Sequence, residues 1–390
     1  MITVVRRTLA TRLIHAALTA QPGAAHTRMH RQIWSPCPAS TLALPWYLAE
    51  PLPRPLLPAS TGIPRGHARR NANIISEGSC GTVYKGSFPG RREMAIKRRG
   101  KYSLWGEEAF QAEITILSSI HHKYIVRLLG WCAVEEEKRL LPFLERKEME
   151  RLLIYEYMEN GFLSNHLHSL KWSSSPVRAS WKMRIETLLG VSRAIEYLHV
   201  FALPPVIHRD VKTSNIMLDS SWAPRLIDFG LSLTWDETEC SGITVQATAG
   251  YVDPEYVTTG NLKPASDVYS FGVVMLEVLT GRTPFSLWGE DMQDMVSFAL
   301  PLIEVGEVWK LLDRRLATEP TPRQLEAADL LAQTAARCLQ LEGEERPAIS
   351  EVAANLQGAL ELVHGDGGTN LKTQQGELNP QIYLQWHPIL

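Results

Sequence analysis

The hydrophobic and polar positions of the chain follow two different periods in two consecutive regions. Between Ile74 and Met158, short apolar runs typical of strands alternate with turns, and one helical pattern spans Glu107 to Ile120. Beyond this region the apolar residues recur at helical spacing, which predicts a small strand-rich part followed by a larger helical part. The helices predicted there cover residues 180–200, 265–280, 291–304, 322–340 and 349–363.

A highly charged segment, residues 135–151, interrupts the strand-rich part. It lies between two apolar runs and is longer than a hairpin turn needs. The apolar run that follows it, residues 152–158, is typical of a strand that continues into a connection. Because the charges favour contact with water, we expect residues 135–151 to be a solvated excursion between two strands.

The first part of the chain, residues 1–73, differs from the rest in composition. It contains nine of the 24 prolines, which prevent a regular helix or ladder, so we expect a disordered extension. It is also basic: nine arginines and one acid, Glu50, give it a formal charge of +8, against −10 for the remainder. Val5, Leu9 and Leu13 recur at helical spacing without acids, so a transit peptide and a wrongly chosen start codon stay open as alternatives.

The overall composition is globular, with 45% hydrophobic and 21% charged residues. The five cysteines form no Cys-x-x-Cys pair, which argues against a zinc site or a disulfide framework and favours a reducing compartment. No apolar run reaches the length of about 18 residues that a membrane span needs. We therefore expect a cytoplasmic protein without a nucleic-acid partner; attachment to the plasma membrane through a partner and import into an organelle are the alternatives. Residues 364–390 are expected to form a flexible tail.

Residues 206–230 carry polar side chains in an order that suits phosphoryl transfer. They contain His-Arg-Asp-x-Lys-x-x-Asn and then Asp-Phe-Gly. Asp210 is placed to orient a hydroxyl and accept its proton, and Lys212 can neutralise the transferred phosphate. Asn215 and Asp228 supply hard oxygen ligands of the kind that Mg2+ requires. Any one of these residues could be an ordinary loop charge, but their combination in this order is specific.

A second group of residues suits the binding of phosphates. Gly78 and Gly81 lie in a turn between the first two predicted strands, where the absent side chains let backbone amides approach a phosphate. Lys97 follows on the third strand, and the helix predicted after it offers Glu113 as a partner. The Gly-x-x-Gly pattern alone is a weak signal, and it gains weight from this lysine and glutamate.

With these motifs in order, residues 74–363 resemble the eukaryotic protein kinase family. Residues 250–256 and 266–272 are similar to plant receptor-like kinases, and residues 195–208 and 311–315 are most like the Crinkly-type members. Those proteins normally carry an ectodomain and a membrane span, which we do not find in this sequence.

The resemblance implies an α+β, bilobal protein-kinase fold. Its small antiparallel β lobe with one helix would cover residues 74–158, and its large, mainly helical lobe residues 159–363. The implied cofactors are ATP and Mg2+.

The resemblance also implies a role for each matching residue. Gly78 and Gly81 would cover the ATP phosphates. The residues implied to surround adenine are Tyr155 as gatekeeper, Glu156 and Met158 through their backbones, and Val83, Ala95 and Met217 as an apolar sandwich. The implied catalytic residues are Asp210, Lys212, Lys97 and Glu113, and the implied metal ligands are Asn215 and Asp228. Glu255 would pair with Arg346 to brace the segment that follows Asp228.

The pattern with Lys212, together with Thr248 before Gly250, is similar to that of the serine/threonine kinases. The resemblance therefore implies transfer of the γ-phosphoryl group of ATP to serine and threonine hydroxyls of protein substrates, in receptor-like kinase signalling and with a receptor as a possible partner. Three departures from the family pattern are Ser76 for the first loop glycine, Cys80 for an aromatic residue and Ala247 for a glycine. If position 76 needs a glycine-only backbone, serine costs about 1 kcal/mol. A pseudokinase scaffold in a receptor complex is the alternative.

Deletion of residues 1–70 is expected to leave the melting temperature and the kinase activity nearly unchanged, because a proline-rich segment without a core contributes no packing. The measurement compares thermal unfolding and incorporation of labelled phosphate between the full and the shortened chain. If the shortened chain melted several degrees lower, the basic extension would have to be docked on the acidic body.

Overall fold

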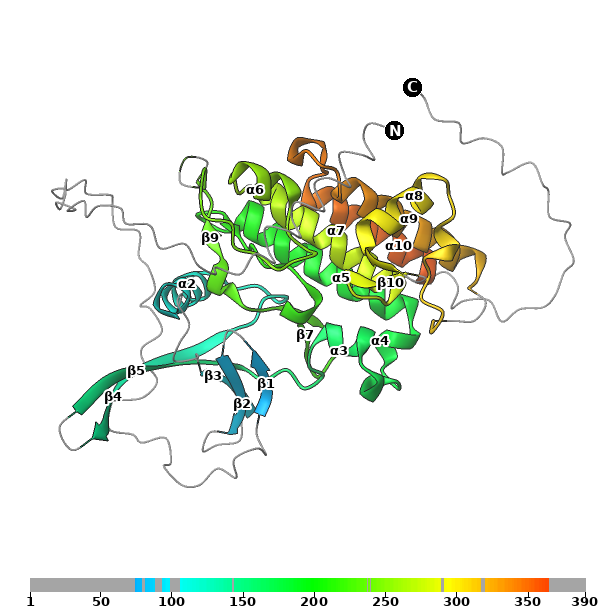
Figure 1. The fold of residues 1–390 in the computed structure, drawn as a ribbon. Coiled ribbons are helices and arrows are strands. Elements are labelled where there is room, and N and C mark those ends of the chain that lie inside the picture. The colour runs from blue at the N-terminus through cyan, green and yellow to red at the C-terminus, as the bar shows by residue number, and fades with distance from the viewer. Residues whose placement is uncertain are drawn as a thin grey trace, which may run out of the picture.

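The computed structural model describes residues 74–364, apart from gaps at 79–80, 88–92, 99–105, 142–143, 237, 239, 289–290 and 317–319. The described chain forms a strand-rich lobe and a larger helical lobe (Figure 1). The expected antiparallel sheet with one helix, followed by a mainly helical part, is confirmed. The expectations for residues 1–73, for Cys80 and for the tail after His364 lie outside the described residues.

The strand-rich lobe is built on a five-stranded antiparallel sheet with the order β1-β2-β3-β5-β4. Its strands are β1 (Ile74–Gly78), β2 (Gly81–Ser87), β3 (Glu93–Arg98), β4 (Leu128–Leu141) and β5 (Leu144–Glu156). The helix α2 (Gly106–Ser119) covers this sheet because its apolar residues recur on one face. Phe110 of α2 meets Trp131 of β4 edge to face, with the ring centroids 6.3 Å apart.

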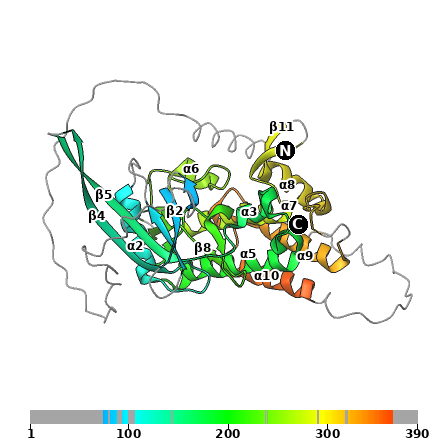
Figure 2. The same cartoon turned by 90° about the horizontal axis from the view of Figure 1, so that it is seen from below.

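The expectation for residues 135–151 is wrong, because the backbone there continues the β4–β5 hairpin as paired strands. The register sets Glu137 opposite Lys147 and Arg139 opposite Glu145. The same register sets Glu136 opposite Glu148 and Lys138 opposite Arg146, so matched charges do not account for the pairing. Apart from residues 140–144, the segment lacks an apolar run, so a reading based on hydrophobic runs does not detect these strands. Figure 2 shows the hairpin extending away from the body of the molecule beyond α2.

The helical lobe confirms the five helices predicted after residue 180, with ends displaced by a few residues. Its helices are α3 (Leu163–His168), α4 (Pro176–Ala179), α5 (Trp181–Glu196), α6 (Pro254–Thr259), α7 (Pro264–Thr280), α8 (Met295–Glu304), α9 (Pro322–Cys338) and α10 (Ile349–His364). At the predicted start of α8, the strand β11 (Asp291–Asp294) instead pairs with β10 (Phe285–Trp288). Nearly every residue of α7 is buried, and Figure 1 shows this helix among its neighbours at the centre of the lobe.

Two short ladders near the junction of the lobes hold the segment that carries the transfer motifs. β6 (Val206–Ile207) pairs with β9 (Leu233–Thr234), and β7 (Ile216–Leu218) pairs with β8 (Pro224–Leu226). β6, β7 and the ends of β8 are buried, because these runs are apolar on both faces. The loops between these strands are thereby brought side by side.

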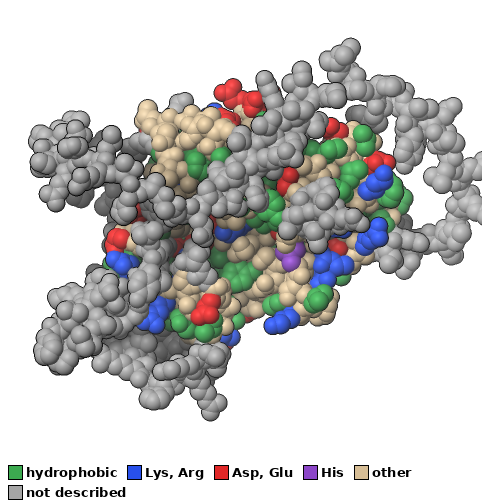
Figure 3. All heavy atoms as spheres, in the orientation of Figure 1, with side chains coloured by type: hydrophobic (Ala, Val, Ile, Leu, Met, Phe, Trp, Pro, Cys, Tyr) green, Lys and Arg blue, Asp and Glu red, His purple; other side chains and the backbone are tan. Residues whose placement is uncertain are grey.

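The described residues also show the state of the cysteines, the distribution of surface charge and whether any helix could span a membrane. No described helix is long and apolar enough to cross a membrane. The described cysteines, Cys132, Cys240 and Cys338, are free thiols. On the face shown in Figure 3, acidic and basic side chains are interspersed over the described surface.

Replacement of Gly272 by alanine is expected to destabilise the helical lobe. A Cβ at Gly272 in α7 would lie 2.9 Å from Cys338 Cβ and 2.9 Å from Leu339 Cγ. Such overpacking costs about 1 to 3 kcal/mol, against a gain in helix propensity of about 1 kcal/mol. Urea unfolding should therefore give a lower free energy of unfolding for Gly272→Ala.

Gly358→Ala in α10 is the matched control, because the nearest atom to its added Cβ, Leu330 Cδ2, is 3.7 Å away. This variant should be as stable as the unmodified chain or slightly more stable. Equal stability of the two variants would show that α7 and α9 can separate enough to admit a methyl group.

Candidate active site

A cleft of about 590 Å³ lies between the lobes and collects most of the predicted site residues. Those that line it are Gly81, Val83, Ala95, Lys97, Glu113, Tyr155, Glu156, Met158, Lys212, Asn215, Met217 and Asp228. Among the described side chains of the site, Asp210 is not part of the lining. Gly78 faces Gly81 in the β1–β2 ladder, and Asp210 lies beside Asn215, whose side chain contacts it. The apolar and polar residues of the lining come from both lobes, so the cleft is built by their packing.

The ammonium group of Lys97 lies between two carboxylates. Its Nζ is 3.2 Å from Glu113 Oε2 of α2 and 2.7 Å from Asp228 Oδ1 of the helical lobe. Glu113, with a side chain only 1% exposed, also accepts a hydrogen bond from the hydroxyl of Tyr155 at 2.6 Å. The sequence predicted the Lys97–Glu113 pair. The contact of Tyr155 was missed, because nothing in the order of residues signals which group its hydroxyl meets.

The loop before Asp210 is held by one buried carboxylate. Asp267 of α7 accepts the backbone N–H groups of His208 and Arg209, each at 2.8 Å. Arg209 has a φ of 71° and Asp228 a φ of 68°, in the left-handed region that non-glycine residues rarely adopt. Such backbone strain persists only where the surroundings hold it, and it concentrates at functional sites.

Asp210, Lys212 and Asn215 meet at one point, together with Thr248. Asp210 Oδ2 accepts a hydrogen bond from Asn215 Nδ2 at 2.8 Å, and Lys212 Nζ lies 2.8 Å from the same oxygen. Thr248 donates its hydroxyl proton to Asp210 Oδ1 at 2.6 Å and accepts a hydrogen bond from Lys212 Nζ at 2.7 Å. The arrangement therefore binds an aliphatic hydroxyl between a carboxylate and an ammonium group. The sequence did not predict these contacts of Thr248.

The donor set at the cleft fits a magnesium ion that is shared with a phosphate ligand. Asn215 and Asp228 both line the cleft, and Asn215 directs its amide nitrogen toward Asp210, which leaves its carbonyl oxygen as an acceptor. Within the described residues no group of three or more His, Cys, Asp or Glu could hold a metal by itself. Mg2+ is commonly held by one or two protein oxygens together with substrate phosphates, which is the number of donors present.

A sequence model of the protein kinase domain matches residues 70–356, more than half of the chain. The chain belongs to the protein kinase family. The resemblance to plant receptor-like kinases is also confirmed. The serine/threonine-protein kinase-like proteins CCR3 and CCR4 of Arabidopsis thaliana are 40% and 39% identical over 76% and 73% of this chain. The receptor-like protein kinase HERK 1 of the same plant is 36% identical over 79%.

The kinase chain spans a minor part of these relatives. The matches cover 37% of CCR3, 38% of CCR4 and 36% of HERK 1. The match to the protein kinase domain covers the region that folds into the two lobes and ends at residue 356.

The expected backbone cost of serine in the kinase phosphate loop is not found. Ser76 lies in β1 opposite Val83 of β2 and lines the cleft. Only three described non-glycine residues have a φ in the left-handed region, and neither Ser76 nor Ala247 is among them. An extended backbone suits any residue, so the premise that position 76 needs glycine is wrong for this chain.

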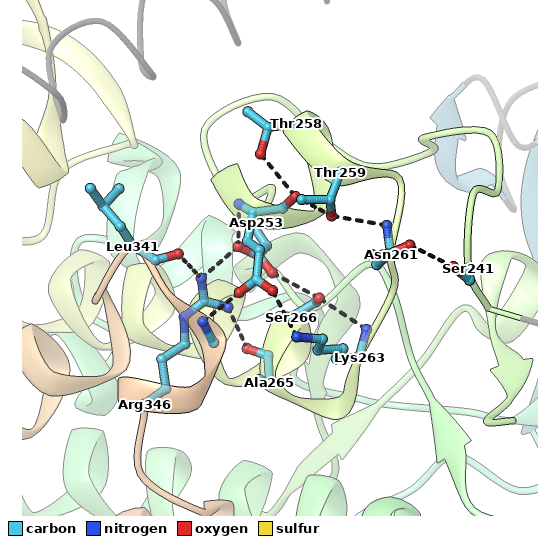
Figure 4. A network of polar contacts seen from close by, with 12 residues as sticks. Ser241, Asp253, Thr258, Thr259, Asn261, Lys263, Ala265, Ser266, Leu341 and Arg346 are labelled. Carbon is cyan, nitrogen blue, oxygen red and sulfur yellow. Dashed lines mark hydrogen bonds and ion pairs between the residues drawn. The ribbon is translucent and has the colours of Figure 1, made fainter. Parts of the chain in front are cut away.

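The expected pair of Glu255 and Arg346 is replaced by a different arrangement, shown in Figure 4. Arg346 Nη2 bonds to Asp253 Oδ1 at 2.6 Å, and its other donors reach backbone carbonyls that include Ala265 O at 2.9 Å. Glu255 instead accepts from Lys263 Nζ at 2.8 Å. Burial alone would raise the pKa of Glu255, but the hydrogen bonds from Lys263 and a backbone N–H outweigh it and lower this pKa. Arg346 therefore braces the segment through the residue that caps α6.

Replacement of Arg346 by alanine is expected to lower the free energy of unfolding by about 3 to 5 kcal/mol, because it leaves a buried carboxylate without its partner. The side chains of Arg346 and Asp253 are 0% and 4% exposed. Urea unfolding of the purified variant measures the change.

The matched control is Arg337→Ala. Arg337 pairs with Glu351 at the surface, where the two side chains are 51% and 47% exposed. Its loss should cost less than about 1 kcal/mol. Similar losses for the two arginines would mean that burial of the Arg346 pair does not govern its contribution.

Proposed function

We propose that this chain is a serine/threonine protein kinase, which transfers the γ-phosphoryl group of ATP to serine and threonine hydroxyls of proteins. The observation that supports this most directly is the 2.6 Å hydrogen bond from Thr248 Oγ1 to Asp210 Oδ1. It presents an aliphatic hydroxyl to a carboxylate at the distance that general-base catalysis requires. The names of CCR3 and CCR4 as serine/threonine-protein kinase-like proteins support the same substrate class.

In the proposed reaction, the oxygen of the substrate hydroxyl forms a bond to the γ-phosphorus. The proton of that hydroxyl passes to the carboxylate of Asp210, the bond from phosphorus to the bridging oxygen breaks, and ADP leaves. Lys212, which lies 2.8 Å from Asp210 Oδ2, would neutralise charge on the transferred group. Lys97, held by Glu113, would contact the other phosphates. Thr248 has to release Asp210 as the substrate hydroxyl enters.

The family generally uses ATP and a divalent metal, and we propose Mg2+ held by Asn215 and Asp228. The bound ion would neutralise negative charge on the phosphates. Val83 and Ala95 of the sheet and Met217 of the helical lobe would enclose the adenine ring. The backbones of Glu156 and Met158 would be its hydrogen-bond partners. A cleft of about 590 Å³ is large enough for such a ligand.

A cytoplasmic location and a receptor partner are part of the proposal. Relatives such as HERK 1 are named as receptor-like protein kinases, which supports a receptor partner. Imaging a carboxyl-terminal fluorescent fusion would distinguish this from membrane attachment through a partner and from import into an organelle. The alternative function, a pseudokinase scaffold, requires that purified protein transfers no phosphate.

The test is incorporation of labelled phosphate from ATP into the protein itself and into a generic protein substrate, with and without Mg2+. Asp228→Asn should lower the rate by at least about a thousandfold, because it removes the charge that would hold the metal. Its melting temperature should change little.

Asp329→Asn, an exposed position on α9, is the control for loss of an acidic charge and should keep full activity. An inactive wild-type protein would favour the pseudokinase. Near-normal turnover of Asp228→Asn would mean that Asp228 does not hold the metal.

A further inference from the structure

A second cavity, of about 370 Å³, adjoins the nucleotide cleft. Val126 and Glu156 line both cavities, so the two share a wall where the lobes are connected. The lining of the second cavity is mostly polar. Its polar residues are His121, His122, Lys123, Arg127, Glu156 and Arg225.

The charge of this lining is positive. Lys123, Arg127 and Arg225 face a single carboxylate in the lining, Glu156. The charge of Arg225 is partly compensated, because its Nη2 lies 2.9 Å from Asp219 Oδ2 and its Nη1 lies 3.6 Å from Glu156 Oε1. Lys123 and Arg127 form no ion pair within the described part of the chain. Two cations of the pocket are therefore available to an anion.

The ring of His122 is held in place within this lining. It stacks on Tyr197, with centroids 4.9 Å apart and an interplanar angle of 11°, and it meets Tyr124 edge to face at 5.6 Å. Its Nδ1 accepts the backbone N–H of Tyr124 at 3.4 Å, so the neutral ring carries its proton on Nε2 and can donate there. A donor whose orientation is fixed by two rings loses little entropy on binding a ligand.

The pKa of His122 is lowered mainly by burial of its ring. The charges of Lys123 and Arg225 lower this pKa further, and the charge of Glu196 opposes them. An anion bound beside these groups would reverse part of that shift, because it stabilises the protonated ring. Binding would then take up a proton, and affinity for an anion would rise as the pH falls.

We propose that this pocket is a binding site for a small ligand that carries a dianionic group of the phosphate class. Guanidinium groups bind such tetrahedral anions through charge-assisted hydrogen bonds, and the cavity volume lies within the range of natural ligand sites. The pocket does not depend on the proposed kinase activity, so the two can be tested separately.

The test uses sulfate as the probe, because it remains a dianion over the range in which histidine titrates, about pH 5 to pH 8. Sulfate is titrated against chloride at constant ionic strength, and the rise in melting temperature gives an apparent affinity. The pocket variant combines Lys123→Ala with Arg127→Ala. The control combines Lys171→Ala with Arg323→Ala, which removes two exposed charges of the same kind elsewhere.

The apparent affinity for sulfate should be at least about tenfold weaker in the pocket variant than in the wild type or the control. In the wild type it should also increase as the pH is lowered. Equal responses in all three proteins would show an adventitious ion only, or binding in the nucleotide cleft, and would overturn the proposal. No response of the wild type would overturn it as well.

Discussion

The buried carboxylate of Asp267 is the contact on which the geometry of the site depends. It is 1% exposed, and it accepts the backbone N–H groups of His208 and Arg209 while His199 Nε2 lies 2.9 Å from it. Hydrogen bonds to a buried carboxylate are stronger than those between neutral groups, and they hold Arg209 in its left-handed conformation. Asp210 is the next residue along the chain. Its position is therefore set by α7, the most deeply buried helix of the lobe.

The same helix holds the site from its other end. Glu277 of α7 accepts hydrogen bonds from the hydroxyls of Tyr251 at 2.6 Å and Thr213 at 3.1 Å, and His168 Nε2 lies 2.7 Å from it. Burial, and then the charge of Glu277, raise the pKa of Tyr251, so its phenol stays protonated and continues to donate. Segments that are distant in sequence are thus fixed on one rigid element, and the hydroxyl of Thr248 can meet Asp210 at hydrogen-bond distance.

The order of the transfer residues could be predicted from sequence, because it is a local property. Asp210, Lys212 and Asn215 lie within six positions of one another on a loop bounded by apolar strands, and this spacing limits how far apart they can be. Helix periods located α5, α7, α9 and α10 for the same reason. The charged hairpin at 135–151 was missed because, apart from residues 140–144, it lacks the apolar run that marks a buried strand, and its backbone continues the ladder begun by the apolar parts of β4 and β5.

By itself, the sequence determined the two-lobed order of strands and helices and the set of groups available for phosphoryl transfer. Tertiary structure decided which carboxylate meets which cation. Lys97 contacts Asp228, 131 positions away, and Arg346 contacts Asp253 in preference to the nearby Glu255. The physical reason is that a buried charge takes the partner that the packing of distant elements brings within about 3 Å, and spacing along the chain carries no record of that packing.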